Sequence, residues 1–284
     1  MESNLANLSI NEFEINYNKA LEKVNMPMYH YHDTFEIYYL LSGERFYFIK
    51  DRTYHVMKGD LVFINIGDLH KTTSTPKPAH ARLVINFKES FIHPLADCSS
   101  TNILDVFKRE INLIRLGAME QNEVEQILHK IHSEYKNSEQ FSMLNIKSLL
   151  LQLLIFMNRY KNPLTESNIR HPSAIHGKIY EVVQFINQNY SDRLKLENLA
   201  KKFYFSPFYL CKMFKQVTGF SFTEYLNSVR IKESQKLLRE TSLPISEIAC
   251  KVGYDNLTHY GRVFKEISGT TPTGYRKNLI TQKG

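Results

Sequence analysis

Cysteine is scarce in this chain of 284 residues, and long apolar runs are missing. The three cysteines, Cys98, Cys211 and Cys250, are odd in number and widely spaced, which argues against a disulfide scaffold and predicts a reducing, cytoplasmic location. The first residues lack a basic start followed by an apolar run, so no signal peptide is expected. The most apolar stretch, residues 149–157, is too short to span a bilayer. These absences exclude secreted disulfide-rich proteins and membrane-spanning proteins.

Acidic residues are also scarce in the last third of the chain. Residues 174–284 contain 17 Lys and Arg against 9 Asp and Glu, a net charge of +8, whereas residues 1–173 contain 19 and 20, a net charge of −1. This asymmetry favours a polyanionic partner for the C-terminal third. A well-solvated basic surface would give the same count, so charge alone does not decide between the two.

Short runs rich in β-branched and aromatic residues occupy residues 28–87, separated by turn-forming residues. Many short strands with close turns are typical of an antiparallel sandwich or barrel. Two segments with helical length and periodicity follow, at residues 119–135 and 142–160. The second is apolar on nearly every face, which predicts burial between the barrel and a second subunit.

A polar segment with two prolines and no apolar period, residues 161–173, is typical of an interdomain linker. Every segment after it has helical periodicity. The sequence therefore predicts an α+β multidomain protein. Residues 1–160 are expected to form an antiparallel, jelly-roll-like β-barrel with dimerisation helices, and residues 174–284 an all-α domain.

One pattern occurs twice in the C-terminal third. The matching pairs, 49 or 50 residues apart, are Leu199-Ala200 with Ile248-Ala249, Phe214-Lys215 with Phe264-Lys265, and Gly219 with Gly269. Each copy predicts a short helix, a tight turn and a second helix, the arrangement whose second helix enters the DNA major groove. A plain helical bundle would explain one copy, but two copies on the only basic third of the chain favour DNA binding.

The second copy carries a specific resemblance. Its matching residues are Ile248-Ala249, Val252-Gly253-Tyr254, Arg262-Val263-Phe264-Lys265, Gly269, Thr271-Pro272 and Tyr275-Arg276, with a departure at Gly261 and, in the first copy, at Lys212. In these residues the chain resembles the AraC/XylS family of bacterial transcription regulators. The resemblance implies two helix-turn-helix units that read successive major grooves about 34 Å apart. It also implies one long connecting helix, residues 222–240, whose buried side carries Phe222, Leu226, Val229 and Leu237.

The family motif also implies which side chains contact DNA. Those at base edges are Phe208, Cys211 and Lys212 in the first unit and Leu257, Thr258, His259 and Arg262 in the second. Arg262 is the strongest candidate, because bidentate pairing of Arg with guanine is the commonest specific contact, while Phe208 and Leu257 suit thymine methyl groups. Lys215, Lys265 and Arg276 are implied to contact phosphates, which position the protein without specifying sequence.

A second motif lies in the N-terminal part. Its residues are His30, His32, Glu36 and Gly43, followed by Gly59 and His70, and they resemble both cupin motifs, except that Asn65 stands where proline is usual. Because residues two apart on a strand share a face, His30 and His32 can point into the same interior. Glu36 and Tyr38 share that parity if the strand continues without a bulge.

Three interpretations of this set stay open. It can line a ligand-sensing site for a small polar molecule such as a sugar, which sensor barrels of the resembled family commonly hold. It can hold a divalent transition metal, since imidazole and carboxylate are suitable ligands. It can also form hydrogen bonds that only hold the barrel together. The first interpretation is favoured.

The sequence thus predicts a ligand-responsive, sequence-specific DNA-binding regulator with no cofactor and no enzymatic activity. The resemblance implies an activator that contacts RNA polymerase, and the helices around residues 120–160 are expected to form a homodimer. The alternative is a metal-dependent cupin enzyme with a DNA-binding tail. That enzyme would need an open metal position beside a general acid or base, and the sequence assigns neither.

Overall fold

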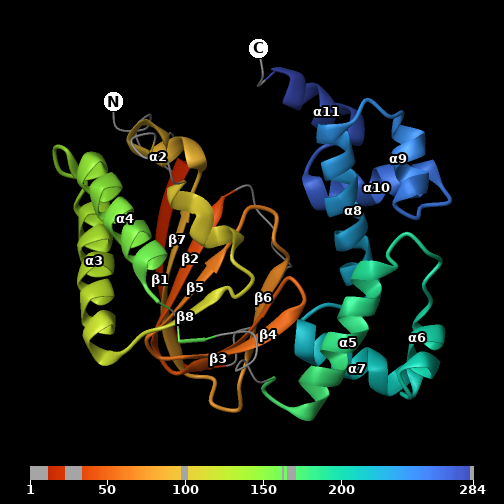
Figure 1. Ribbon diagram of the computed structural model, residues 1–284, viewed down its shortest axis with the longest axis horizontal. Coiled ribbons are helices and arrows are strands. Elements are labelled where there is room, and N and C mark those ends of the chain that lie inside the picture. Colours follow the sequence, from red (N-terminus) through yellow and green to blue (C-terminus); the bar gives the residue numbers. More distant parts are fainter. Residues whose placement is uncertain (1–11, 23–33, 97–101, 162, 165–170, 282–284) are drawn as a thin grey trace. The chain divides into compact units, whose positions relative to one another are not determined.

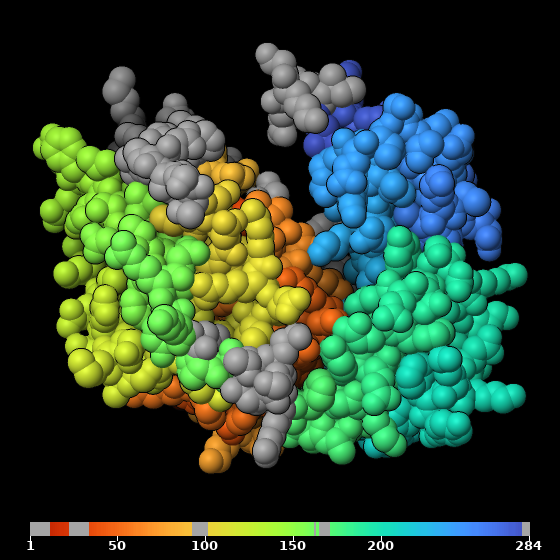
Figure 2. Space-filling model, viewed as in Figure 1, coloured from red at the N-terminus to blue at the C-terminus, as the bar shows by residue number. Residues whose placement is uncertain are grey.

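The computed structural model describes residues 12–22, 34–96, 102–161, 163–164 and 171–281, and the other residues are grey in Figures 1 and 2. The chain forms two compact units, Met1–Pro172 and Ser173–Gly284, each with a core of its own. None of the helices within the described ranges combines the length and the apolar character that crossing a bilayer requires.

Two antiparallel sheets form the N-terminal unit, one with strand order β1-β7-β2-β5-β8 and the other with order β4-β3-β6. The strands are β1 Phe13–Ala20, β2 Phe35–Ser42, β3 Glu44–Ile49, β4 Arg52–Met57, β5 Asp60–Ile64, β6 His70–Ser74, β7 His80–Phe87 and β8 Leu113–Arg115. A closed barrel needs a ladder at every strand edge. Within the described residues no ladder joins the two sheets, so the predicted barrel is an open two-sheet sandwich.

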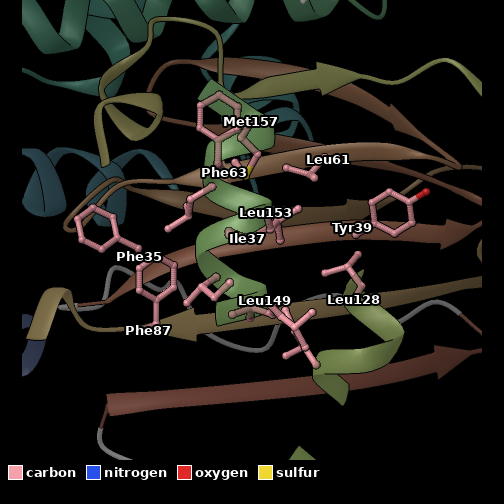
Figure 3. Packing of buried hydrophobic residues seen from close by; sticks show 14 of the residues in the cluster. Phe35, Ile37, Tyr39, Leu61, Phe63, Phe87, Leu128, Leu149, Leu153 and Met157 are labelled. Carbon is pink, nitrogen blue, oxygen red and sulfur yellow. The ribbon is translucent and has the colours of Figure 1, made fainter. Parts of the chain in front are cut away.

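The central strand β2 separates two cores, because successive side chains point to opposite faces of a sheet. Phe35, Ile37 and Tyr39 belong to an apolar cluster that includes residues of the covering helices. Figure 3 shows these side chains meeting those of the helices. Tyr38 and Leu40, on the other face of β2, belong to a cluster shared with β3 and β4 of the second sheet. The space between the sheets is therefore lined by the even-numbered residues of β2.

Helices cover the outer face of the five-stranded sheet (Figure 1). The helical elements of this unit are α2 Glu89–Ala96, the 3-10 helix η1 Ile103–Lys108, α3 Ala118–Asn137 and α4 Ser142–Arg159. On α4, Leu150 and Leu153 are fully buried, but Leu144 is 59% exposed and Ile155 39% exposed. The helix predicted to be buried on nearly every face is thus buried within this chain on one side and open on the other.

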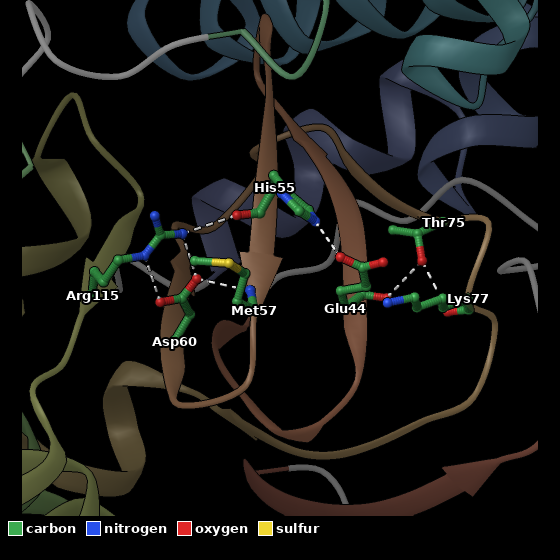
Figure 4. Close-up of polar contacts among 7 residues, drawn as sticks. All are labelled: Glu44, His55, Met57, Asp60, Thr75, Lys77 and Arg115. Carbon is green, nitrogen blue, oxygen red and sulfur yellow. Dashed lines mark hydrogen bonds and ion pairs between the residues drawn. The ribbon is translucent and has the colours of Figure 1, made fainter.

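Polar contacts tie β5 to β8 (Figure 4). Arg115 donates two hydrogen bonds to the Asp60 carboxylate, at 3.0 and 2.8 Å, and a third to the carbonyl of His55 at 3.0 Å. The same carboxylate accepts the backbone N–H of Met57 at 2.9 Å. The hydrogen bond to Asp60 raises the pKa of Arg115, although burial opposes it. This pairing satisfies the charge of a fully enclosed carboxylate and fixes the short edge strand β8.

The C-terminal unit is all helical, as predicted. Its helices are α5 Ala174–Gln188, α6 Leu196–Lys202, α7 Pro207–Thr218, α8 Phe222–Glu240, α9 Ile245–Lys251, α10 Leu257–Ser268 and α11 Pro272–Thr281. A capping box starts α8: the Ser221 side chain accepts the N–H of Glu224, whose carboxylate accepts the N–H of Ser221. The connecting helix therefore has the bounds predicted for it.

The buried side of α8 differs from the predicted one. Leu226 is buried, but Phe222, Val229 and Leu237 are only half-buried. The positions that are buried instead include Tyr225, Ser228, Ile231, Ser234, Gln235 and Leu238. Polar side chains on this stripe find partners: for example, Ser228 donates to the carbonyl of Glu224 at 2.9 Å. An apolar period could not reveal them, because their burial depends on these hydrogen bonds.

Candidate nucleic-acid interface and effector site

The first helix-turn-helix unit consists of α6, a tight turn and α7. Tyr204 makes the turn in a left-handed conformation, with φ 59°. The N–H of Phe205 then bonds the carbonyl of Ala200 at 2.8 Å, which ends α6. Ser206 starts α7, because its side chain accepts the N–H of Tyr209 at 3.2 Å.

The second unit, α9 and α10, repeats this construction. Gly253 takes the left-handed position with φ 92°, and the N–H of Tyr254 bonds the carbonyl of Ala249 at 2.9 Å. Asn256 starts α10 by accepting the N–H of His259 at 2.9 Å. The sequence repeat thus corresponds to two copies of one backbone motif.

Aromatic side chains fix each second helix to its core. Phe214 of α7 is fully buried and packs edge-on against Tyr225 of α8, with ring centroids 5.6 Å apart. Phe264 of α10 is equally buried and packs against Tyr260 at 5.7 Å. Tyr260 also hydrogen-bonds Ser234 of α8. Each helix therefore has one anchored side and one side open to a partner.

The open side of α7 carries the side chains that the sequence analysis assigned to DNA. Phe208 is 80% exposed, and Cys211, Lys212 and Lys215 are exposed as well. A groove of about 450 Å³ runs along this side, lined by Phe208, Cys211, Lys212, Lys215 and Gln216. This side combines apolar and cationic groups, which suits base edges together with phosphates.

The open side of α10 carries the second predicted set. Leu257 is 53% exposed, and Thr258, His259, Arg262 and Lys265 are exposed. The His259 ring packs edge-on against Tyr254, with centroids 5.6 Å apart, so the imidazole is held at the start of the helix. The structure therefore places all five residues at exposed positions of one helix in the unit with the excess of basic residues.

Arg276 is the exception among the predicted DNA contacts. It lies on α11 and is only half-buried, with Nε and Nη2 enclosed and without a hydrogen-bond partner among the described residues. Burial raises the pKa of Tyr260, and the hydrogen bond to Ser234 and the charge of Arg276 act against that rise. Arg276 thus lies partly against the core of the second unit, and its contact with phosphate stays a prediction.

In the N-terminal unit, Glu36 and His70 lie together although they belong to different sheets. His70 is fully buried, and its Nε2 lies 3.6 Å from the Glu36 carboxylate. The His70 Nδ1 lies 2.7 Å from the carbonyl of Asp68, so this nitrogen carries the proton that it donates. Tyr47 of β3 donates to the other Glu36 oxygen at 2.6 Å. The sequence motif thus assembles a real polar cluster, and Tyr47 is a member that it missed.

Tyr38 lies on the same face of β2 and is fully buried. Burial raises the pKa of Tyr38 to about 12, although the charges of Arg82 and Arg45 act to lower it. Neither arginine was predicted. The signal was present in the alternation of β7, where Arg82 and Asn86 share one face while the residues between them are apolar.

His30 and His32, the other two predicted members of this site, lie outside the described residues. Within the part of the chain that the structure describes, no three His, Cys, Asp or Glu side chains are grouped so that they could hold a metal ion. The structure brings Glu36, Tyr38 and His70 together, and a metal site would need both histidines of the motif as well.

Family comparisons agree with this division of the chain. Residues 23–154 match the model of the AraC-like ligand binding domain, and residues 199–278 match that of a helix-turn-helix domain. The HTH-type transcriptional activator RhaR of Mannheimia succiniciproducens is 23% identical over 252 residues, covering 88% of this chain and 87% of that protein.

Two solved structures are also similar. The C-terminal domain of AraT, a response regulator from Geobacillus stearothermophilus, is 36% identical, covers 37% of this chain and 88% of that one, and has a TM-score of 0.36. Fatty-acid-bound ToxT from Vibrio cholerae is 17% identical, covers 93% and 95%, and has a TM-score of 0.41. The two matched family models, in the order of sensor and DNA-binding domain, show that the chain belongs to the AraC/XylS family of transcriptional regulators.

Proposed function

We propose that the protein binds a specific promoter sequence with α7 and α10, and that a small molecule between the N-terminal sheets controls this binding. The observation that carries the proposal is the repeated helix-turn-helix, which presents two anchored helices with open, cation-bearing sides on the basic unit. The proposed base-edge contacts are Phe208, Cys211, Lys212, Leu257, Thr258, His259 and Arg262, and the proposed phosphate contacts are Lys215, Lys265 and Arg276.

A binding assay on residues 173–284 tests the DNA function. Affinity for promoter duplexes should fall steeply as salt rises, because bound phosphates release counterions. Fluorescence anisotropy at two salt concentrations measures this fall. If no promoter fragment from the genome binds even at low salt, the proposed function is wrong.

The proposed effector site contains Glu36, Tyr38 and His70, with His30 and His32 as further predicted members. Support comes from the cluster of buried polar groups between the sheets, an arrangement that suits a small polar ligand. His32→Ala and Glu36→Ala should change the response to the effector in a reporter assay. DNA binding by residues 173–284, which lack both positions, provides the reference for binding without the effector site. Unchanged induction in both variants would assign these residues to structure.

We further propose a homodimer formed through the open side of α4. Leu144, Leu151 and Ile155 are spaced seven and four residues apart on this helix, the spacing of a coiled-coil seam. Leu144→Glu combined with Ile155→Glu should give monomers in sedimentation velocity, whereas Gln152→Glu, an exposed position on the same helix, should not. Dimers that persist in the double variant would place the interface elsewhere.

The relatives are transcriptional regulators, which supports an activator that contacts RNA polymerase in the cytoplasm and has no enzymatic activity of its own. RhaR is named a transcriptional activator. A reporter assay in which deletion of this gene lowers promoter output supports activation, and raised output would indicate repression. Metal analysis of the purified chain tests the enzyme alternative, which requires a stoichiometric metal.

A further inference from the structure

Strand β7 adds a second set of polar side chains to the effector site. Alternate residues of β7 belong to the apolar core under the helices, so Arg82, Val84 and Asn86 face the three-stranded sheet. In the register with β2, Val84 lies opposite Tyr38 and Asn86 lies opposite Glu36. Arg82 and Asn86 therefore lie on either side of Tyr38, one strand away.

Three buried polar atoms in this set have no hydrogen-bond partner within 3.5 Å among the described residues: Tyr38 Oη, Arg82 Nε and Asn86 Oδ1. The Arg82 side chain is still near enough to the Tyr38 hydroxyl to interact with it and to lower its pKa against the larger effect of burial. An unpaired buried polar group destabilises the fold, because it has lost its hydrogen bonds to water. Buried polar groups in folded proteins nearly always have a partner, which can be a bound molecule. Three such atoms on two neighbouring strands indicate one shared partner.

The charge around these atoms is positive. The Arg82 guanidinium lies 5.7 Å from the centre of the Tyr38 ring and forms no ion pair within the described ranges. Arg45 of β3, 2% exposed, and His80, 4% exposed, are close enough to be affected by that charge. Their pKa values are lowered, mainly by burial and further by the charge of Arg82.

The carboxylate of Glu36 is the negative charge in this cluster, and it is held by other groups. It accepts the Tyr47 hydroxyl at 2.6 Å and lies 3.6 Å from His70 Nε2. Around the Tyr38 hydroxyl, the charges of Arg82 and Arg45 each affect the pKa more strongly than that of Glu36. The surroundings of the Tyr38 hydroxyl therefore favour negative charge.

We propose that the effector is an acid whose carboxylate or phosphate group binds the Arg82 guanidinium and the Tyr38 hydroxyl between the two sheets. This inference rests on the proposed effector function of the same site. Guanidinium and phenol groups donate, and an anion supplies the acceptors. Asn86 can pair with a hydroxyl of the same molecule in either orientation of its amide. A neutral sugar would leave Arg82 without an anionic partner.

The test uses the full chain and two sets of probes: glycerol, glycerate and glycerol 3-phosphate, and glucose, glucuronate and glucose 6-phosphate. Each set compares a neutral compound with its carboxylate and phosphate counterparts at equal ionic strength. Binding raises the melting temperature, so a thermal shift measures it. We expect the carboxylate or the phosphate to bind and the neutral compound not to. Arg82→Met should weaken that binding about 10- to 100-fold.

Lys19→Met is the matched control. Lys19 is exposed on β1, next to β7, and its parity places it on the opposite face from Arg82. The control corrects for anions that bind elsewhere, including the basic C-terminal unit. Tyr38→Phe removes one hydroxyl and should also reduce the thermal shift that the acid produces. This variant tests the proposal if Arg82→Met does not fold.

Equal acid shifts in wild type, Arg82→Met and Tyr38→Phe would overturn the proposal. A neutral probe that binds wild type and Arg82→Met alike would overturn it too, while leaving effector sensing intact. Failure of the DNA-binding assay on residues 173–284 would contradict the proposed function and not this inference.

Discussion

The two helix-turn-helix units share one frame. Both turn through a left-handed residue, Tyr204 or Gly253, and both start the second helix with a polar side chain that caps it. Both second helices end at a left-handed glycine, Gly219 or Gly269. Their cores hold a fully buried phenylalanine at the same place. The backbone and the buried side chains therefore repeat wherever the fold depends on them.

The open sides of the two units are different. At matching positions, Phe208 of α7 corresponds to Thr258 of α10, and Lys212 corresponds to Arg262. The first helix presents an aromatic ring and a point charge, and the second a hydroxyl and a planar guanidinium. A shared frame with different open sides is what two units need if each reads its own half of an asymmetric site. The comparison predicts that sequence specificity depends on these differing pairs, Phe208 with Thr258 and Lys212 with Arg262.

Removing the core aromatics tests the shared frame and has the largest expected effect. Phe214→Ala and Phe264→Ala should each lower the free energy of unfolding by about 3–5 kcal/mol, because both rings are fully buried. Urea unfolding of residues 173–284 measures this. The controls are Lys215→Ala and Lys265→Ala, exposed neighbours expected to stay within about 0.5 kcal/mol. A small loss for one phenylalanine only would break the equivalence of the units.

Replacing the cationic side chains Arg262 and Lys212 by alanine tests the difference between the open sides. Arg262→Ala should lose about 1–3 kcal/mol at the cognate site and relax the preference at one or two base pairs. Lys212→Ala should lose less, because an ammonium makes no bidentate fork with guanine. Anisotropy on cognate and scrambled duplexes at two salt concentrations separates the two effects.

Lys265→Ala provides the reference for a phosphate contact in that experiment. It should weaken all sequences alike and lower the salt slope by about one phosphate's share. If Arg262→Ala also weakens cognate and scrambled DNA by the same factor, Arg262 does not read a base, and the assignment of α10 fails.

Substitutions at the left-handed turn residues, Gly253 and Tyr204, test the shared frame with a smaller expected effect. Gly253→Ala should destabilise by about 1–2 kcal/mol, because its φ of 92° is left-handed and an added Cβ would lie 2.6 Å from the carbonyl oxygen of Ser191. Tyr204→Gly should do the opposite by up to about 1 kcal/mol, since Tyr204 is 95% exposed and pays only the left-handed strain. Urea unfolding of both variants decides it. If Tyr204→Gly also destabilises, the Tyr204 side chain makes stabilising contacts that outweigh its left-handed strain.

Much of the C-terminal unit could be predicted from the sequence because its signals are local. The offset of 49 to 50 residues, the Ser-Pro start of α7 and the glycines after both second helices lie next to the elements that they define. The buried stripe of α8 could not be predicted in the same way. Ser228 and Ser234 are buried there through hydrogen bonds, and apolar periodicity does not detect such positions.

The N-terminal unit was harder because its features depend on pairing between distant strands. β1 was missed, since only three of its eight residues are buried and the others are polar. The antiparallel sheets were predicted, but closure into a barrel was not correct, because local strand patterns do not determine which edges pair. Glu36 and His70 were predicted as one site from motif spacing, whereas Arg82 joins it only through the register of β7 on β2.

The thymine methyl groups provide the smallest and sharpest test of the two open sides. Phe208 is 80% exposed in the groove of α7, and Leu257 is 53% exposed at the start of α10, so each can contact a methyl group in its own half-site. Replacing thymine by deoxyuridine removes the methyl and keeps every hydrogen-bonding group of the base. Each contacted methyl should contribute about 0.8 kcal/mol to the binding free energy, the value for one buried CH₂.

Deoxyuridine in the first half-site should therefore weaken DNA binding by wild type and not by Phe208→Ala. Deoxyuridine in the second should weaken wild type and not Leu257→Ala. Anisotropy of wild type and each variant, on duplexes with thymine and with deoxyuridine in the relevant half-site, measures this pattern. If Phe208→Ala stays as sensitive as wild type to loss of the first-half methyl groups, its ring does not read them, and the difference between the two helices has to be sought in their cations alone.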